Sequence, residues 1–90
     1  MITVQVAVAQ PNAGSDRAAK LFAEGHELAS QGKYVEACAK FDESLALEHA
    51  AGTLLNLGQC NEKQGHLLKA WQSYDEAARI WEAARDERGS

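Results

Sequence analysis

The chain has 90 residues, which is enough for one small domain with a modest core. Its hydrophobic fraction of 46% is rich in alanine and it contains a single proline, a composition that favours helices over strands. A formal net charge of −4 argues against nucleic acid and anionic membrane surfaces as partners, and no apolar run is long enough to span a bilayer.

The first fifteen residues differ from the rest of the chain. Three valines alternate with small or polar residues, which is a strand-like period, but a strand here would have to pair with another chain. Alternatively, Ala7-Val8-Ala9 before Gln10 has the small-residue pattern of a signal-peptidase site, although a basic start and a longer apolar core are missing. We therefore predict a flexible arm or a residual signal or processing segment over residues 1–15, followed by a helical domain over residues 16–90.

Apolar residues then recur at three- and four-residue spacing, which is typical of amphipathic helices. Gly32 and Gly65 are placed to end the first and third helices, because glycine adopts the left-handed C-cap conformation without a Cβ penalty. The predicted helices cover residues 16–31, 34–47, 52–64, and 67 to about 86 or 87. The expected fold class is all-α, with four antiparallel helices.

The helical part of the sequence repeats itself once. Four pairs of identical or similar residues are each separated by 33 positions: Gly25 and Gly58, Gly32 and Gly65, Ala37 and Ala70, Phe41 and Tyr74. A period in this range indicates stacked helix–turn–helix units. A glycine in the middle of a helix costs about 1 kcal/mol relative to alanine. A close approach of two helices at Gly25 would explain why that cost is accepted.

These residues and their spacing resemble the tetratricopeptide (TPR) repeat, over about residues 18–82. Leu21 and Leu54 stand where that family often has tryptophan. The departures are a period of 33 instead of 34, and substitutions at five positions: His49 and Glu82 for proline, Leu28 and Asn61 for tyrosine, and Ser44 for a small alanine. The strings EACAKF, GTLLNLGQC and AWQSY are also similar to exported TPR proteins of some bacteria. The location of the protein stays open, with a periplasmic or exported one favoured over the cytoplasm.

The resemblance implies a concave groove that binds a peptide or a partner protein, lined by the first helix of each pair. The positions that would line it here are Phe22, His26, Ser30, Leu55, Asn56, Gln59, Glu62 and Lys63. Such a mixture of apolar side chains and amides suits a partner that offers both apolar groups and backbone. These residues would otherwise be ordinary solvated positions. A clamp for a carboxyl-terminal tail is not expected, because Phe22 and His26 replace the lysine and asparagine of family members that have one.

The two cysteines, Cys38 and Cys60, match no zinc-binding pattern. They belong to the antiparallel second and third helices and could face each other. In an oxidising compartment they could form a disulfide that locks the first repeat to the second. The alternative is two small buried thiols.

The last helix carries apolar residues on a face that in the first repeat receives the next repeat. Those residues are Leu68, Trp71 and Ala78. Exposed apolar patches of this kind mark interfaces, so we predict that this face and Trp81 mediate self-association, as in a homodimer, or meet a C-terminal extension. Alternatively, the long helix bends back and Trp81 covers the gap.

Nothing in the sequence predicts catalysis. His26, His49 and His66 have no cysteine or acid at metal-ligand spacing, and no serine has the context of a nucleophile. We therefore expect no enzyme activity, no cofactor and no metal. The predicted function is a non-catalytic protein–protein interaction module that binds in the groove. The alternatives are a self-assembling structural subunit and a fragment of a larger exported scaffold.

Overall fold

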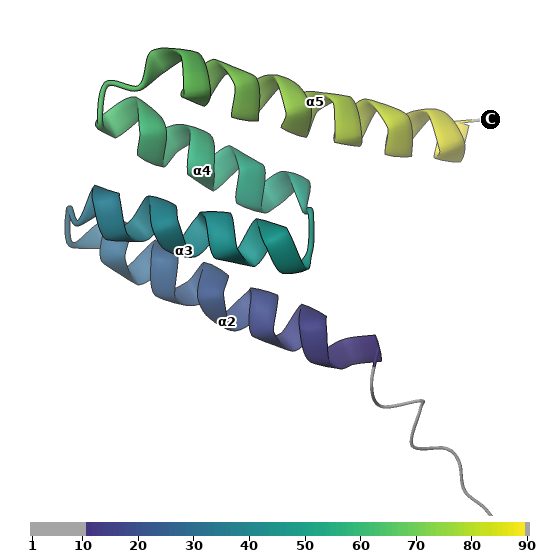
Figure 1. The fold of residues 1–90 in the computed structure, drawn as a ribbon. Helices are drawn as coiled ribbons and strands as arrows, with labels where there is room; N and C mark the ends of the chain where they lie inside the picture. The colour runs from purple at the N-terminus through teal and green to yellow at the C-terminus, as the bar shows by residue number, and fades with distance from the viewer. Residues whose placement is uncertain (1–10, 90) are drawn as a thin grey trace, which may run out of the picture.

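The computed structural model describes residues 11–89, which form four helices and no strand (Figure 1). The helices are α2 (Pro11–Ser30), α3 (Tyr34–Leu47), α4 (Ala51–Lys63) and α5 (Leu67–Gly89). Helix α2 packs on α3 to form the N-terminal hairpin, α4 packs on α5 to form the C-terminal hairpin, and α3 packs on α4 between them. The predicted all-α fold with two antiparallel helix pairs is confirmed. The strand-like and processing interpretations of residues 1–10 lie outside the described residues.

Helix α2 begins five residues earlier than predicted. Residues 11–15, which the sequence placed in the arm, are part of this helix. Proline is well tolerated there, since its fixed φ suits the helix and its missing N–H would have no acceptor within the helix. Ser15 Oγ also donates a hydrogen bond to Glu48 Oε2 at 3.2 Å, which links the start of α2 to the end of α3.

Both hairpins turn in the same way. Gly32 and Gly65 have φ values of 79° and 80°, the left-handed conformation predicted for them. In the first turn, Gly32 N donates to Ala29 O and Lys33 N donates to Leu28 O, each at 2.9 Å. The second turn has the same two bonds 33 residues later, also at 2.9 Å. This pair of bonds is the Schellman motif, so each turn is closed by one glycine and four backbone groups.

The following helix approaches closely at each mid-helix glycine, as predicted for Gly25. A Cβ atom on Gly25 would lie 2.7 Å from Cε1 of Phe41, and one on Gly58 would lie 2.5 Å from Cε1 of Tyr74. Both distances are shorter than van der Waals contact. The absence of a side chain at each glycine therefore lets an aromatic ring of the following helix rest on the helix backbone.

The core consists of two clusters, one on each side of α4. The cluster between α3 and α4 contains Ala37, Cys38, Phe41, Leu57 and Cys60, and the smaller one contains Ala51, Leu54 and Ala77. The half-buried side chain of Leu45 touches both clusters. The α3–α4 contact therefore joins the two hairpins into one folded unit.

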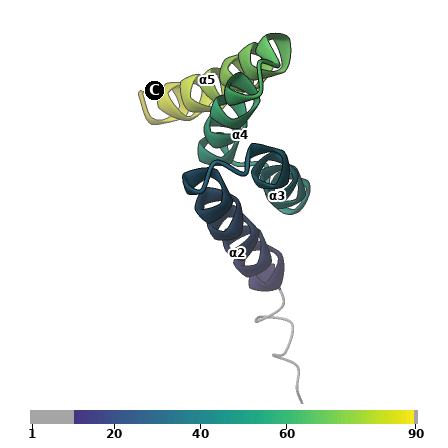
Figure 2. The same ribbon diagram turned by 90° about the vertical axis from the view of Figure 1, so that its left-hand side faces the viewer.

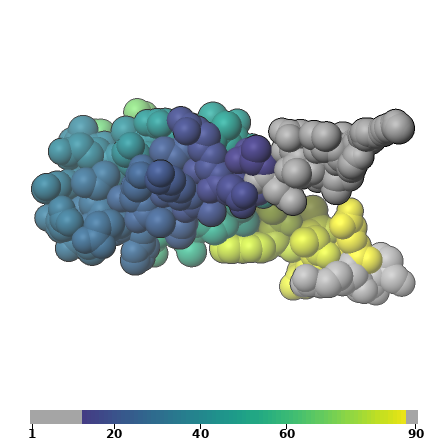
Figure 3. Space-filling model, turned by 90° about the horizontal axis from the view of Figure 1, so that it is seen from below, coloured from purple at the N-terminus to yellow at the C-terminus, as the bar shows by residue number. Residues whose placement is uncertain are grey.

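The four helices are arranged as an open layer in which sequential helices are neighbours. Figure 2 shows the C-terminal hairpin turned relative to the N-terminal one, so that α2 and α4 scarcely touch. Helix α5 has 23 residues whereas α4 has 13, and its C-terminal end projects beyond the body of the molecule (Figures 1 and 3). The layer therefore has two surfaces that no further helix covers: the space between α2 and α4, and the outer side of α5.

Candidate functional site

A surface depression of about 250 Å³ lies between α2 and α4, with α3 beneath it. We call it the groove. Its lining residues are His26, Ala29 and Ser30 from α2, Tyr34 and Phe41 from α3, and Asn56, Gln59, Cys60 and Lys63 from α4. The α2 and α4 residues recur at three- and four-residue spacing, so each helix presents one face to the groove. Five of the eight predicted groove residues are brought together here: His26, Ser30, Asn56, Gln59 and Lys63.

The other three predicted residues do not line the groove. The ring of Phe22 packs against the core and lies 5.7 Å from the ring of Phe41 and 6.3 Å from that of His26, measured between centroids. Phe22 therefore packs between the core and the ring of His26. Leu55 is partly buried outside the groove. Glu62 is turned toward α5, where its Oε1 accepts a 2.8 Å hydrogen bond from the hydroxyl of Tyr74.

The contact with Glu62 also affects the ionisation of Tyr74. Burial raises the pKa of Tyr74 to about 12, and the hydrogen bond to Glu62 and the negative charge of that carboxylate act in the same direction. Tyr74 therefore stays a neutral hydrogen-bond donor throughout the physiological pH range. The pair ties α4 to α5 on the side away from the groove.

Sequence reasoning missed Tyr34, Phe41 and Cys60 as lining residues. Phe41 is a core residue that is only 1% exposed, but its ring also forms part of the groove floor. Tyr34 begins α3 directly after the Gly32 turn, which places it at the end of the groove. The available signal was the short turn itself, because it brings the first turn of the next helix next to the last turn of α2.

The polar side chains of the groove differ in what they already bind. Ser30 Oγ donates to Glu27 O at 2.6 Å, and Asn56 Nδ2 donates to Gly52 O at 2.9 Å. The side chains of Gln59 and Lys63 make no hydrogen bond or ion pair with any other residue that the structure describes. No lining residue is acidic. The groove therefore offers the ammonium group of Lys63, the uncommitted amide of Gln59, the imidazole of His26 and the hydroxyl of Tyr34 above a floor of alanine and aromatic rings.

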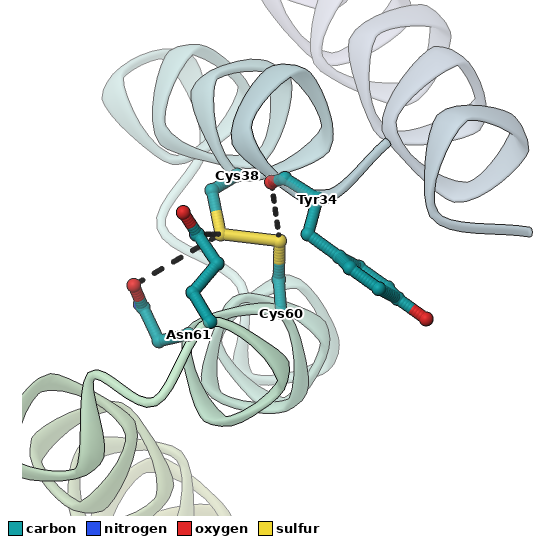
Figure 4. The surroundings of a disulfide bond; sticks show 5 residues. Tyr34, Cys38, Cys60 and Asn61 are labelled. Atoms are coloured by element: carbon teal, nitrogen blue, oxygen red, sulfur yellow. Dashed lines mark hydrogen bonds between the residues drawn. A yellow bond between two sulfur atoms is a disulfide. The ribbon is translucent and has the colours of Figure 1, made fainter. Parts of the chain in front are cut away.

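A disulfide between Cys38 and Cys60 forms part of the wall next to the groove (Figure 4). It joins α3 to α4, and so joins the two hairpins. Gln64 Nε2 donates to Cys38 Sγ at 3.0 Å, and Cys60 Sγ lies 2.9 Å from the backbone oxygen of Tyr34. Because a disulfide sulfur carries no hydrogen, the latter is a sulfur–oxygen contact. A covalent link at this point constrains the angle between the hairpins, and that angle sets the distance between α2 and α4.

The four residues predicted for self-association, Leu68, Trp71, Ala78 and Trp81, are all exposed on α5. Leu67 is exposed as well. Trp71 is 61% exposed and Trp81 is 50% exposed. Helix α5 runs without interruption from Leu67 to Gly89, so it does not bend back to cover this surface.

Comparisons with known proteins identify no family for this chain: no family model, curated protein or solved structure matches it. Within the described residues there is no group of three or more histidine, cysteine or acidic side chains arranged to hold a metal ion. None of the described helices combines the length and the apolar character needed to cross a bilayer.

Proposed function

We propose that the chain is a non-catalytic protein–protein interaction module of the TPR type that holds a peptide segment of its partner in the groove between α2 and α4. The observation that carries this proposal is the pairing of uncommitted polar groups, Gln59 and Lys63, with an apolar floor in the space that the two hairpins leave open. The repeated glycine–aromatic contact, Gly25 with Phe41 and Gly58 with Tyr74, supports the comparison with TPR repeats.

The lining residues suggest what the partner segment offers. With Lys63 as its cation and no acidic side chain, the groove favours carbonyl or carboxylate oxygens over cationic groups. The amide of Gln59 both donates and accepts, which suits the peptide backbone. A volume of about 250 Å³ is smaller than most small-molecule sites and holds one or two side chains. The rest of a bound peptide would therefore lie across the exposed surface of α2 and α4.

The test begins with a library of random peptides displayed on phage and selected on the oxidised full-length chain. Enriched peptides are then titrated into labelled protein while amide and side-chain NMR signals are followed. We expect the largest shifts at His26, Gln59 and Lys63. The double variant Gln59→Ala/Lys63→Ala should bind the same peptides at least tenfold more weakly, because removing two polar contacts costs at least about 1.4 kcal/mol.

A matched control separates groove binding from general charge effects. The variant Gln72→Ala/Lys69→Ala removes the same two residue types from a surface between α3 and α5. It should leave peptide affinity unchanged. Equal affinities for the wild type and the groove variant, or NMR shifts confined to residues outside the groove, would contradict the proposed function.

A further inference from the structure

A second surface, separate from the groove, lies on the outer face of α5. We define it as Leu67, Leu68, Trp71, Ala78 and Trp81. The first repeat shows how the equivalent surface of α3 packs when another helix follows it. Cys38 and Leu45 of α3 pack against α4, and Cys38 is only 8% exposed. The residues 33 positions later are Trp71 and Ala78, both exposed.

We propose that this face binds the same face of a second copy of the chain, with the two α5 helices antiparallel around a two-fold axis. Four exposed side chains and the half-buried Tyr74 have the spacing that helix pairing requires. Leu67, Trp71, Tyr74, Ala78 and Trp81 follow one another at intervals of four, three, four and three residues. This is the spacing of a coiled-coil seam, in which such positions face a partner helix.

Copies joined end to end, with α5 of one against α2 of the next, are disfavoured by the charged residues of α2. The α4 residues Leu57 and Cys60 belong to the core cluster that joins α4 to α3. Their counterparts 33 positions earlier on α2 are Glu24 and Glu27. Joining α2 of one copy to α5 of the next would bury these carboxylates against tryptophan, at a large desolvation cost.

The α5 positions that would face those carboxylates do not offset that cost. The side chains at the α5 positions corresponding to Cys38 and Phe41 are Trp71 and Tyr74, neither of them cationic. Arg79 is held by Asp75 of its own helix, with Nε 2.8 Å from Oδ2. Lys40, which does pair with Glu24 at 3.3 Å, lies on α3 at the same end as that acid. A closed pair in which like faces meet therefore fits better than open-ended growth.

The geometry of α5 suits an antiparallel pair. Trp71 and Trp81 are ten residues apart, about 15 Å along the helix. A two-fold axis near residue 76 places Trp71 of each copy opposite Trp81 of the other. Ala78 then lies near the axis, where its small side chain allows close approach. A pairing along one helix buries on the order of 1,000 Å² in total, the lower limit for a specific interface, so we expect a dimer with a Kd in the micromolar range.

Analytical ultracentrifugation of the oxidised full-length chain, from low to high micromolar concentration, tests the proposal. We expect a monomer–dimer equilibrium that stops at two copies, with a blue shift of tryptophan emission as the dimer forms. Trp71→Glu/Trp81→Glu should remain monomeric throughout, with unchanged circular dichroism. Ala78→Arg should weaken the dimer at least tenfold and serves as a second variant that keeps both tryptophans.

The matched control is Val35→Glu/Leu47→Glu, which places the same charge on exposed apolar residues of α3 and should leave the dimer intact. Hydrogen exchange should show slower exchange in α5 at high concentration. A monomer at every concentration, growth beyond two copies, or a dimer that survives both α5 variants would each overturn the proposal. Protection confined to residues 1–10 would also overturn it, in favour of the N-terminal segment as the occupant of this face.

Discussion

The two hairpins share a repeated pattern, but they are covered to different extents. In the N-terminal hairpin, Phe41 rests on Gly25 and is covered by α4, so that it is only 1% exposed. In the C-terminal hairpin, Tyr74 rests on Gly58 in the same way, but it is only half-buried and its hydroxyl reaches Glu62. The comparison shows that the glycine–aromatic contact is repeated in both hairpins. The polarity of the aromatic side chain, in contrast, depends on whether another helix covers it.

A second pair of equivalent positions shows the same dependence on local packing. Ser44 is fully buried, and its Oγ donates to Ala18 O at 2.8 Å, which fastens α3 to α2. The counterparts 33 residues later are Ala77 and Ala51, which belong to one apolar cluster. The same space between two helices is thus filled by a hydrogen bond in one hairpin and by methyl groups in the other.

Removing the aromatic ring from each hairpin should give the largest difference between them. Phe41→Ala should lower the free energy of unfolding by about 4 kcal/mol, because it leaves a cavity beneath both helices of the groove. Tyr74→Ala should cost no more than about half as much, because its ring is partly solvated already. Guanidinium chloride unfolding followed by circular dichroism measures both values. Equal losses would show that burial by α4 does not distinguish the hairpins.

Removing the disulfide should have the next largest effect. Its two cysteines are 22 residues apart, and a closed loop of this length stabilises the folded chain by about 3 kcal/mol in the chain-entropy model. Cys38→Ala/Cys60→Ala should therefore unfold at lower denaturant concentration than the oxidised wild type. Reducing agent should destabilise the wild type and leave the double variant unchanged. A wild type that is insensitive to reduction would contradict this expectation.

Adding one methyl group at each mid-helix glycine should produce a smaller difference. Gly25→Ala gains about 1 kcal/mol in helix propensity but pushes against a ring that cannot move, for which overpacking costs about 1–3 kcal/mol. Gly58→Ala meets the ring of Tyr74, which can swing outward into solvent. We expect Gly25→Ala to be destabilising and Gly58→Ala to be nearly neutral. Thermal unfolding of the two variants side by side checks the order, and the reverse order would contradict it.

The smallest expected effect is a dependence of stability on alkaline pH that only the C-terminal hairpin shows. The pKa of Tyr74 is raised from 10.0 to about 12 in the folded protein. Its contribution is therefore fully present below pH 10 and is lost as the pH rises toward 12. Tyr74→Phe should lose less stability than the wild type across this interval. Parallel denaturant titrations below and above pH 10 would show the difference, and identical pH profiles would rule it out.

Much of the fold could be predicted because the residues that end the helices are easy to recognise in the sequence. Gly32 and Gly65 end their helices as expected, and α3 has the bounds that apolar spacing predicted for it. The start of α2 could not be predicted in the same way. Proline, asparagine and glycine are typical of a linker, and only the context decides whether a proline begins a helix instead.

The groove could be predicted in part. The resemblance to TPR repeats pointed to the first helix of each pair, and the helical period then placed His26, Asn56 and Lys63 on the faces that line the groove. The same spacing could not show that Glu62 would be bound by Tyr74, since that contact depends on how α5 packs against α4. Tyr34 was missed for a similar reason, as its position depends on the geometry of the turn before it.

The cross-link between Cys38 and Cys60 also determines how the protein responds to mechanical load. Tension applied to the two ends of an oxidised chain passes directly between the linked residues, whose Cα atoms are 5.8 Å apart. The stretch between them, residues 39–59, carries no force, so the extended length of about 75 Å from one cysteine to the other stays hidden. An oxidised molecule stretched by optical tweezers would therefore extend less than a reduced one, with the end of α3 and the start of α4 shielded from the pull.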